Sequence, residues 1–488
     1  MADSIPTVPQ VNSNGKPKED NQATKLVKMA MRKYQLGIST DGKAFAFTQD
    51  SPHVALMLKS RKFGLRQQLA RDYFRRFNST PGGSALKDCL DTLEGIAFEK
   101  SPTQLHLRVA GDREAVYIDM ANDASQVVEI RDGSWRITNS APYVFRRTDL
   151  TAPLVTPVKA GKLSQLWRHI NIAPDDRPLL VAMMIDAQIQ PDTSKPITAF
   201  LAEHGSAKST TAKRVVDLID PSTVELRSPP RDLDTWITAA TGSWMVALDN
   251  LGNIPEWLSN ALCRAATGDG NVKRALYTDD DLSVVKFRRS VMITGIDLGG
   301  LNGDLADRLV AIELRAIQNR LHEDELELQW QRERGEILGG LLSLAAKVHH
   351  KLPTVEIADL PRMADFSRVL ASIDAIKGTK GIERYRDRGK HLMADSALSN
   401  SFIAKLIATD TNIESRSAAE ILQMIVPSMD ATGAKPVDWP KTARQVTTLL
   451  TKNAPAIRQL GWEITNDDGE NKENVLKWTL RQPEVQRA

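Results

Sequence analysis

An apolar run that leads into a turn of small residues, and then into a helical pattern, constrains this chain most strongly. The run begins at Ile197, and the turn carries Lys208-Ser209-Thr210. A strand, a tight turn and a helix in this order present backbone N–H groups at the helix start, where they bind phosphate oxygens. We therefore predict a phosphate-binding loop for ATP, made of Glu203, His204, Gly205, Ser206, Ala207, Lys208, Ser209 and Thr210.

The residue types in this turn suggest a role for each polar group. Lys208 would reach the β and γ phosphates, and the Ser209 hydroxyl would bind Mg²⁺. The usual pattern has glycine where this chain has Ala202 and Ala207, so we expect some strain in the turn. The alternative for the loop alone is an ordinary strand–turn–helix that carries a chance Lys-Ser-Thr.

A second apolar strand, Trp244–Asp249, begins 36 residues after Lys208 and ends in a carboxylate. At the carboxyl end of a parallel strand, Asp249 would hold Mg²⁺. The next residue is Asn250, which can position a water molecule but cannot accept its proton. Either Asp249 covers that role, a carboxylate such as Glu203 substitutes, or hydrolysis is slow. The alternative for Asp249 is an aspartate that caps a turn.

The pattern around these motifs predicts an α/β core with parallel strands between residues 160 and 350. Expected helices are Leu163–Asn171, Arg177–Gln188, Lys208–Asp220, Leu233–Thr241, Glu256–Ala266 and Glu325–Lys347. Expected strands are Ile197–Ala202, Trp244–Asp249, Ser290–Gly295 and Leu309–Leu314. The predicted fold class is α/β, a P-loop NTPase core with an N-terminal α+β domain and a C-terminal helical, winged-helix-like domain. Expected limits are a disordered tail at 1–22 and domains at 23–152, 153–350 and 351–488.

The N-terminal domain has two distinct patterns. Residues 23–77 look helical and basic, whereas residues 104–144 alternate with a period of two and predict short strands from Leu105, Ala115, Val127 and Trp135. Seven cations crowd one stretch, Lys59, Arg61, Lys62, Arg66, Arg71, Arg75 and Arg76. They form either a solvated helix face or a contact with nucleic acid or a partner.

The C-terminal stretch ends in a helical pattern, Lys441–Leu460, followed by two short strands around the polar turn 466–472. A helix and a two-stranded ribbon in this order are typical of a winged helix, whose helix enters the major groove of DNA. Arg444, Lys452 and Arg458 would then contact duplex DNA. The alternative is a small helical cap whose hairpin packs on its own core.

Composition excludes several classes of protein. The 64 Lys and Arg nearly balance 61 Asp and Glu, so any nucleic-acid-binding surface must be local. Two distant cysteines, Cys89 and Cys263, argue against a disulfide framework or a zinc site and fit a reducing cytoplasm. The longest apolar run, Leu179–Ile185, is too short to span a bilayer, and we expect no membrane association and a cytoplasmic location.

Five motifs together resemble a known group of ATPases. They are Gly-Ser-Ala-Lys-Ser-Thr (205–210), Ala-Leu-Asp-Asn-Leu (247–251), Leu-Ser-Asn-Ala-Leu-Cys-Arg-Ala-Ala-Thr-Gly (258–268), Arg-Ala-Leu-Tyr-Thr-Asp-Asp (274–280) and Asp-Leu-Ala-Asp-Arg (304–308). Their order resembles the helicase domain of superfamily 3 and of poxvirus- and phage-type primase-helicases in the AAA+ group. It is most similar to ATP-binding proteins of this kind from phages and integrated mobile elements. The resemblance covers residues 160–350 well, the tail loosely and the first 150 residues poorly.

The resemblance implies roles for further residues. Lys273 and Arg274 match a hairpin that grips single-stranded DNA in a ring channel. Arg308 matches an arginine that reaches the nucleotide of a neighbouring subunit, which implies a homo-oligomeric ring. The strand Val291–Gly295 matches the one whose polar end senses the γ-phosphate. The family usually ends this strand with asparagine, whereas this chain has Thr294 and then Asp297. Arg274 is otherwise a surface charge, and Arg308 otherwise pairs with a neighbouring aspartate.

The leading hypothesis is an ATP-dependent DNA-binding motor, a helicase that acts in the replication of a phage or mobile element. A primase or another replication protein would be a further partner. A nucleotide-gated DNA-binding regulator with little turnover is the alternative, supported by Asn250 and by the alanines in the loop. A small-molecule kinase ranks third, because no substrate-binding lid is evident and the C-terminal half would be unexplained.

Overall fold

The computed structural model describes residues 20–60, 64–202, 205–252, 254–268, 270–274, 282–295, 303–317, 322–409, 411–429, 434–471 and 475–482, without the side chains of 271–286. Contacts divide the chain into two units. The first comprises Met1–Ala110, Tyr117–Glu129 and Ile137–Thr151; the second comprises Gly111–Val116, Ile130–Arg136 and Ala152–Ala488. Most of the expected tail lies outside the described residues, and the domain limits expected from the sequence stay predictions.

The first unit packs helices on a mixed sheet. Its helices are α1 (Gln22–Lys33), α2 (Leu65–Phe77) and α3 (Gly83–Ala97). The sheet has the order β4-β1-β2-β3-β10-β5, formed by β1 (Tyr34–Ser39), β2 (Ala44–Thr48), β3 (Ser51–Met57), β4 (Pro102–Thr103), β5 (Leu105–His106) and β10 (Val144–Arg146). Leu26, Leu69 and Leu93 from the three helices share one core with residues of β1 and β2.

The helical pattern expected over 23–77 is wrong between Tyr34 and Met57. This stretch forms the antiparallel strands β1, β2 and β3. Alternate residues Tyr34, Leu36 and Ile38 join the helical core, a period of two that the basic flanks concealed. Gly37 permits the pairing, because a Cβ atom there would lie 2.5 Å from the Phe45 ring.

The strands expected further along are mostly confirmed. β6 (Val109–Gly111), β7 (Ala115–Asp119), β8 (Val127–Arg131) and β9 (Ser134–Thr138) form a four-stranded sheet in that order. The strand expected from Leu105 is divided between β5 and β6, and Arg108 between them donates to the Asp119 backbone oxygen from a fully buried position.

The second unit is built on the predicted parallel sheet, which is confirmed. β11 (Ile197–Leu201), β12 (Met245–Leu248), β15 (Ser290–Gly295) and β16 (Leu309–Glu313) pair in parallel in the order β12-β15-β11-β16. Nearly every residue of these strands is buried, as expected when helices cover both faces of a parallel sheet. All four carboxyl ends therefore meet at one edge.

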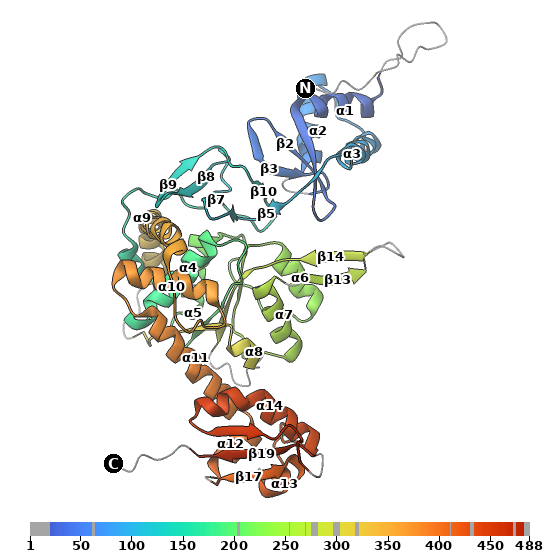
Figure 1. Ribbon diagram of the computed structural model, residues 1–488. Helices are drawn as coiled ribbons and strands as arrows, with labels where there is room; N and C mark the ends of the chain where they lie inside the picture. Colours follow the sequence, from blue (N-terminus) through green and yellow to red (C-terminus); the bar gives the residue numbers. More distant parts are fainter. Residues whose placement is uncertain are drawn as a thin grey trace. The chain divides into compact units, whose positions relative to one another are not determined.

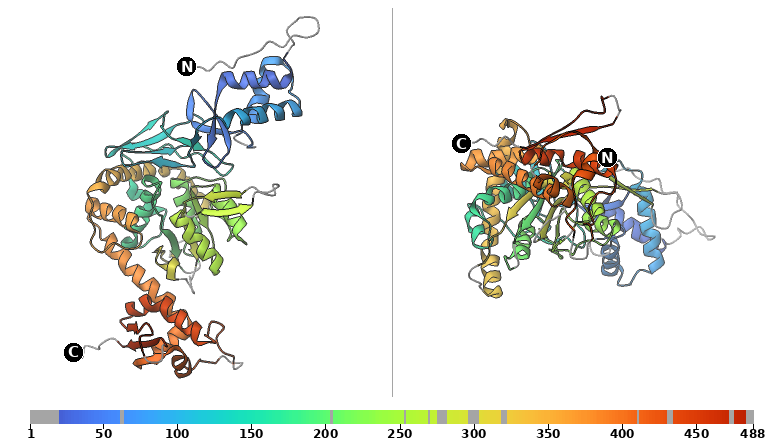
Figure 2. Two further views of the ribbon diagram at one scale, coloured as in Figure 1. Left: turned by 45° about the vertical axis from the view of Figure 1, so that its right-hand side comes forward. Right: turned by 90° about the horizontal axis from the view of Figure 1, so that it is seen from below.

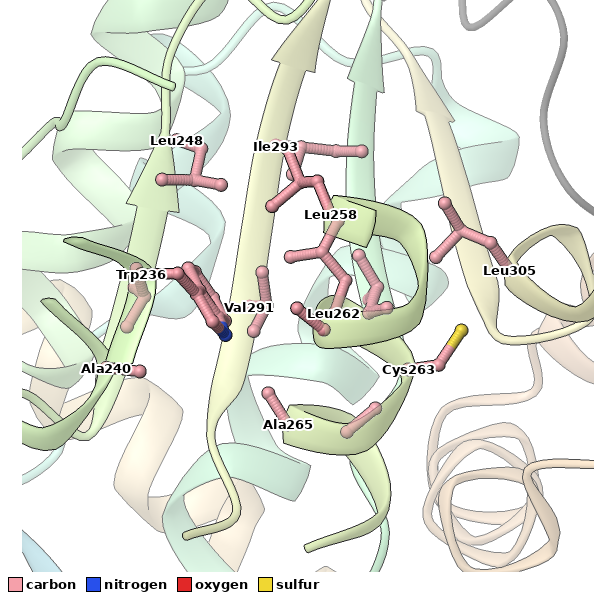
Figure 3. Close-up of a cluster of buried hydrophobic side chains, with 14 of the residues drawn as sticks. Trp236, Ala240, Leu248, Leu258, Leu262, Cys263, Ala265, Val291, Ile293 and Leu305 are labelled. Atoms are coloured by element: carbon pink, nitrogen blue, oxygen red, sulfur yellow. The ribbon is translucent and has the colours of Figure 1, made fainter. Parts of the chain in front are cut away.

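Helices lie on both sides of this sheet (Figure 1). On one side are α4 (Arg177–Ile189) and α5 (Lys208–Ile219), and on the other are α6 (Leu233–Thr241) and α7 (Glu256–Thr267). Leu258 and Leu262 of α7 pack against Val291 and Ile293 of β15, beside Trp236 (Figure 3). These helices match the predicted ones, except that the expected helix at Leu163–Asn171 is a 3-10 helix, η1 (Leu163–Arg168).

Three helices continue the second unit. α9 (Glu323–Lys351) packs on η1 and α4, α10 (Ala364–Lys377) packs on α4, and α11 (Gly381–Leu398) leads from α10 to the C-terminal helices (Figure 2). Buried Asp176, in η2 (Pro174–Asp176), accepts from Arg384 (2.7 Å) and Arg388 (3.2 Å) of α11. These ion pairs fix α11 to the core. A further short 3-10 helix, η3 (Leu352–Thr354), follows α9.

The chain closes in a compact group of helices and strands. Its elements are α12 (Ser401–Ala408), β17 (Ile413–Ser417), α13 (Ala418–Met424), α14 (Ala443–Gln459), β18 (Glu463–Asn466) and β19 (Lys477–Arg481). The predicted helix and two-stranded ribbon are present, and β17 adds a third strand in the order β17-β19-β18. Trp439, Trp462 and Trp478 are buried in its core. Among the described residues, none of the helices has the length and apolar character needed to span a bilayer.

Candidate functional site

The predicted loop lies between the carboxyl end of β11 and the first residue of α5, Lys208. Gly205 has φ +78°, and Ala207 has φ +60° and ψ 34°, so both adopt the left-handed conformation. The Cβ atom of Ala207 makes this conformation unfavourable by about 1–2 kcal/mol, because it lies close to the following carbonyl oxygen. Some strain in the turn was expected from the sequence. The loop residues Glu203 and His204 lie outside the described residues.

Lys208 folds back over the loop. Its Nζ donates to the backbone oxygen of Ala202 at 2.6 Å, so the ammonium closes the turn that begins where β11 ends. Burial lowers the pKa of Lys208, and the nearby Asp249 carboxylate opposes that shift. The two charged groups therefore share one site. In the loop, Ser206 is buried, whereas Thr210, in the first turn of α5, is exposed.

Ser209 and Asp249 meet across the sheet edge. The Ser209 hydroxyl lies 2.9 Å from Asp249 Oδ1 and 3.1 Å from Oδ2 and donates to this carboxylate. The contact joins the first turn of α5 to the residue after β12. A hydroxyl and a carboxylate side by side supply two of the oxygen ligands that Mg²⁺ prefers. The sequence predicted both as Mg²⁺ ligands, and the structure brings them together.

A third strand contributes a group that the sequence argument left in doubt. Thr294, at the end of β15, is buried, and its hydroxyl donates to Asp249 Oδ1 at 2.5 Å. The Thr294 hydroxyl oxygen in turn accepts from the backbone N–H of Asn250 at 3.0 Å. Thr294 thus orients the Asp249 carboxylate and the start of the following loop. The sequence could not predict this contact, because Thr294 lies on the neighbouring strand and belongs to no motif with a fixed spacing from Asp249. Asp297 lies outside the described residues.

Asn250 itself is exposed and adopts a left-handed conformation, with φ +58°. Asparagine tolerates this region better than most residues do. The backbone N–H of Asp249 donates to the backbone oxygen of Arg227 at 2.8 Å. A parallel bridge between Arg227 and Leu248 extends the sheet beside this contact. The Asp249–Asn250 corner is held from both sides.

Arg308 lies away from this group. It directly precedes β16, and its backbone oxygen accepts from Ile197 at the start of β11, so it sits at the amino edge of the sheet. Its guanidinium forms an ion pair with Asp304, whose carboxylate also pairs with Arg362 at 2.8 Å. The Arg308 side chain is only 11% exposed. The local pairing that the sequence left open is therefore present, and Arg308 cannot serve the loop of its own chain.

Lys273 and Arg274 lie on a β-hairpin, as the resemblance implied. β13 (Gly270–Arg274) pairs antiparallel with β14 (Leu282–Lys286), and Lys273 lies opposite Ser283. Both cations occur at the end of the first strand, next to the connecting segment. Their side chains are outside the described part of the structure, so the predicted DNA contact stays a prediction.

The three cations predicted to contact duplex DNA lie on α14. Arg444, Lys452 and Arg458 are all exposed, and at about 100° per residue they fall within roughly 120° of the helix circumference. Arg458 also donates to the Ile464 backbone oxygen at 3.2 Å, which draws it towards β18. The turn between β18 and β19 carries Asp467, Asp468 and Glu470 and is acidic.

Comparisons with known proteins show matches to two family models. The model for the actinomycete integrative conjugative element replication protein matches residues 163–395, and the model for the AICE RepA C-terminal domain matches residues 401–487. The chain has no match among curated proteins.

Two solved structures are similar at low levels. The apo C-terminal region of NrS-1 is 13% identical, with a TM-score of 0.40, over 94% of this chain and 100% of that one. The structure titled SCCmec type IV Cch active helicase is 12% identical, with a TM-score of 0.45, over 93% of both chains. Scores this low establish neither fold nor function.

The two family models together match about two-thirds of the sequence, residues 163–395 and 401–487. They belong to one replication protein and its C-terminal domain. Residues 163–395 are therefore similar to the replication proteins of actinomycete integrative conjugative elements, and residues 401–487 to the C-terminal domain of such a protein.

Proposed function

We propose that this protein binds Mg·ATP at residues 205–210 together with Asp249, and that it is an ATP-driven DNA motor for a mobile element. The observation that carries the proposal is the contact between Ser209 and the Asp249 carboxylate, at the edge where the parallel strands end. Ligands bind at this edge in open α/β sheets, because loops and helix starts converge there.

The residues present fit a phosphate group and a divalent cation. The first turn of α5 supplies N–H groups and the positive end of a helix, and Lys208 supplies a charge that now rests on a carbonyl and would turn to phosphate. Ser209 and Asp249 would hold Mg²⁺, which neutralises charge on the phosphates when bound. Thr294 would keep the carboxylate oriented for this task.

The residue after Asp249 bears on turnover. Asn250 is exposed at the same edge and could orient a water molecule, but its amide cannot accept the proton. Glu203 is a carboxylate in the loop sequence that would fill the role. Slow hydrolysis favours the second candidate, a DNA-binding regulator that is gated by ATP and turns over little.

Two basic elements would bind DNA. The β13–β14 hairpin carries Lys273 and Arg274 near its tip, and α14 exposes Arg444, Lys452 and Arg458 on one side. The order of helices and strands from α12 to β19 is that of a winged helix. We assign duplex contact to α14 alone, because the acidic turn between β18 and β19 would repel phosphates.

Assembly would link ATP sites between subunits. Because Arg308 lies at the edge opposite its own loop, any contact of its guanidinium with nucleotide requires a neighbouring chain. It would first have to leave Asp304. We therefore propose a homo-oligomeric ring in which that exchange accompanies assembly. Arg308→Ala should then remove turnover by the oligomer while leaving nucleotide binding intact.

The test is ATP hydrolysis by the full chain with and without DNA. Lys208→Ala should abolish DNA-stimulated hydrolysis and weaken nucleotide binding. Lys213→Ala, on the same helix, is the matched control. The Lys213 side chain is 50% exposed, and its Nζ forms a long surface ion pair of 4.0 Å with Glu225, which contributes little to stability. Equal activity of the two variants would refute the loop assignment.

Two outcomes separate the motor from the regulator. ATP that binds without turnover but changes DNA affinity would favour the regulator. Hydrolysis by an assembled protein that fails to separate a forked duplex would leave an ATPase and remove the helicase assignment.

A further inference from the structure

Helices α1 and α2 of the first unit carry far more positive than negative charge. Together they contain eight Lys and Arg residues and one acidic residue, Asp72. Asp72 is already neutralised, because Lys33 Nζ lies 2.6 Å from its carboxylate. By contrast, α3 carries one lysine and three acidic residues. The excess of cations is therefore confined to one part of the unit.

The sequence of α2, the helix labelled in Figure 1, carries two phenylalanines among these cations. Phe74 is 50% exposed and Phe77 is 40% exposed. With exposed Gln67, Arg71 and Arg75 they follow spacings of three and four residues, which places all five on one side of the helix. We call these five residues the α2 face.

All five residues of the α2 face remain exposed after folding. The opposite side of α2 supplies Leu65, Leu69 and Tyr73 to the core, so the helix is already anchored. The Phe77 ring packs against the Tyr73 ring, with ring centroids 4.6 Å apart. Arg71 Nε lies 3.6 Å from Asp72 Oδ1, and the Arg76 guanidinium lies over the Phe77 ring, 5.6 Å from its centroid. These contacts still leave 54% of the Arg71 side chain and 40% of Phe77 exposed, and an exposed phenylalanine pair costs solubility. Cations interleaved with aromatic rings are what binding of single strands requires.

We propose that the α2 face binds single-stranded nucleic acid, with Arg71 and Arg75 on phosphates and Phe74 and Phe77 stacked on bases. In a duplex the base faces are covered by their neighbours, so exposed rings favour unpaired strands. Stacking is tolerant of sequence, because every base has a π face. This surface belongs to the first unit and needs no ATP, so it stands independently of the function proposed above.

The first experiment maps the contact in the full-length wild-type chain. A thymidine oligomer with 4-thiothymidine at several positions is photo-crosslinked to the protein, and the attached peptides are identified by mass spectrometry. A uridine oligomer with 4-thiouridine is the second arm and separates DNA from RNA. We expect attachment to peptides that contain Phe74 or Phe77, and strong competition by unlabelled single strand. Absence of these peptides in both arms, or equal competition by duplex, overturns the proposal.

The second experiment measures affinity by fluorescence anisotropy with the same oligomers. Phe74→Ala is compared with Phe98→Ala, because Phe98 is 60% exposed in the same unit but next to acidic α3. From the usual value of a stacked base, Phe74→Ala should lower affinity about fivefold to 100-fold. Phe98→Ala should leave it unchanged. Equal affinity of the two variants overturns the stacking assignment.

The cations are tested by salt dependence. Arg71→Gln with Arg75→Gln is compared with Lys87→Gln and Lys100→Gln, which removes two exposed charges elsewhere in the unit. Each lost phosphate contact lowers the slope of log affinity against log salt by about 0.7 for single strands, so the first pair should lower it by roughly 1.4. Glutamine preserves helix propensity, so α2 should stay folded. An identical slope in both double variants overturns the phosphate assignment, and circular dichroism with thermal unfolding serves as the folding control.

Discussion

Replacing Thr294 by valine removes one hydroxyl from beneath the proposed Mg²⁺ site and keeps the shape of the side chain. In the structure this hydroxyl donates to Asp249 Oδ1 at 2.5 Å and accepts the Asn250 N–H at 3.0 Å. A hydrogen bond to a charged group contributes about 1.5–3 kcal/mol. Asn250 is exposed, so water can replace its lost partner at little cost. We therefore expect the free energy of unfolding to fall by about 1–3 kcal/mol.

The effect on nucleotide binding should exceed the effect on stability. Residues that orient a metal ligand typically affect metal affinity about 10–100-fold. Titration of a fluorescent ATP analogue should show a loss of this order in the presence of Mg²⁺ and a much smaller loss in EDTA. A pure packing defect would weaken both titrations equally, so the difference between them isolates the orientation of Asp249.

The neighbouring strand offers a matched control. Thr198, on β11, is fully buried, and its hydroxyl has no hydrogen-bond partner among the described residues. Thr198→Val removes an unsatisfied polar group and should be neutral or stabilising. If Thr198→Val and Thr294→Val give the same stability and the same Mg²⁺-dependent affinity, our account of the Asp249 corner is refuted.

Three further predictions concern backbone and pH. Ala207→Gly should relieve left-handed strain and change stability by less than about 1 kcal/mol without weakening ATP binding, as measured by thermal unfolding and titration. Gly339→Ala should destabilise by at least about 2 kcal/mol in thermal unfolding, since its Cβ would lie 1.8 Å from a backbone oxygen, whereas Gly389→Ala, in open space, should stabilise by about 0.5–1 kcal/mol. The backbone N–H and the hydroxyl of Ser417 donate to the Glu420 carboxylate and lower its pKa to about 2. The ionised Glu420 therefore stabilises the fold fully above about pH 4.3, and this contribution is lost as the pH falls towards 2. NMR titration of Ser417→Ala should show a higher pKa for Glu420.

Local patterns predicted most elements of the second unit, for a clear physical reason. A strand buried on both faces is an unbroken apolar run, and an amphipathic helix repeats every 3.6 residues, so both are visible in a short window. The segments of β11, β12, β15 and β16 were found this way. β1–β3 were predicted as helix because polar and basic residues around them masked the period of two. Pairing between the strands and packing against α1 determine their conformation.

Some residues of the candidate site could be predicted from the sequence and others could not. Lys208, Ser209 and Asp249 were predicted because each follows an apolar strand, and the carboxyl ends of parallel strands meet. Thr294 could not be assigned, since its contact depends on β15 lying between β12 and β11, an order that leaves no trace in local sequence.

The sequence by itself determined which segments become strands and helices of the core and which residues stand at their carboxyl ends. Those properties depend on hydrophobic periodicity and turn chemistry within about 15 residues. Tertiary structure decided the order of the strands, the hydrogen bonds of the Asp249 corner, the place of Arg308 at the amino edge of the sheet and the exposure of Phe74 and Phe77. Each of these depends on packing between segments far apart in the chain, which no short stretch of sequence encodes.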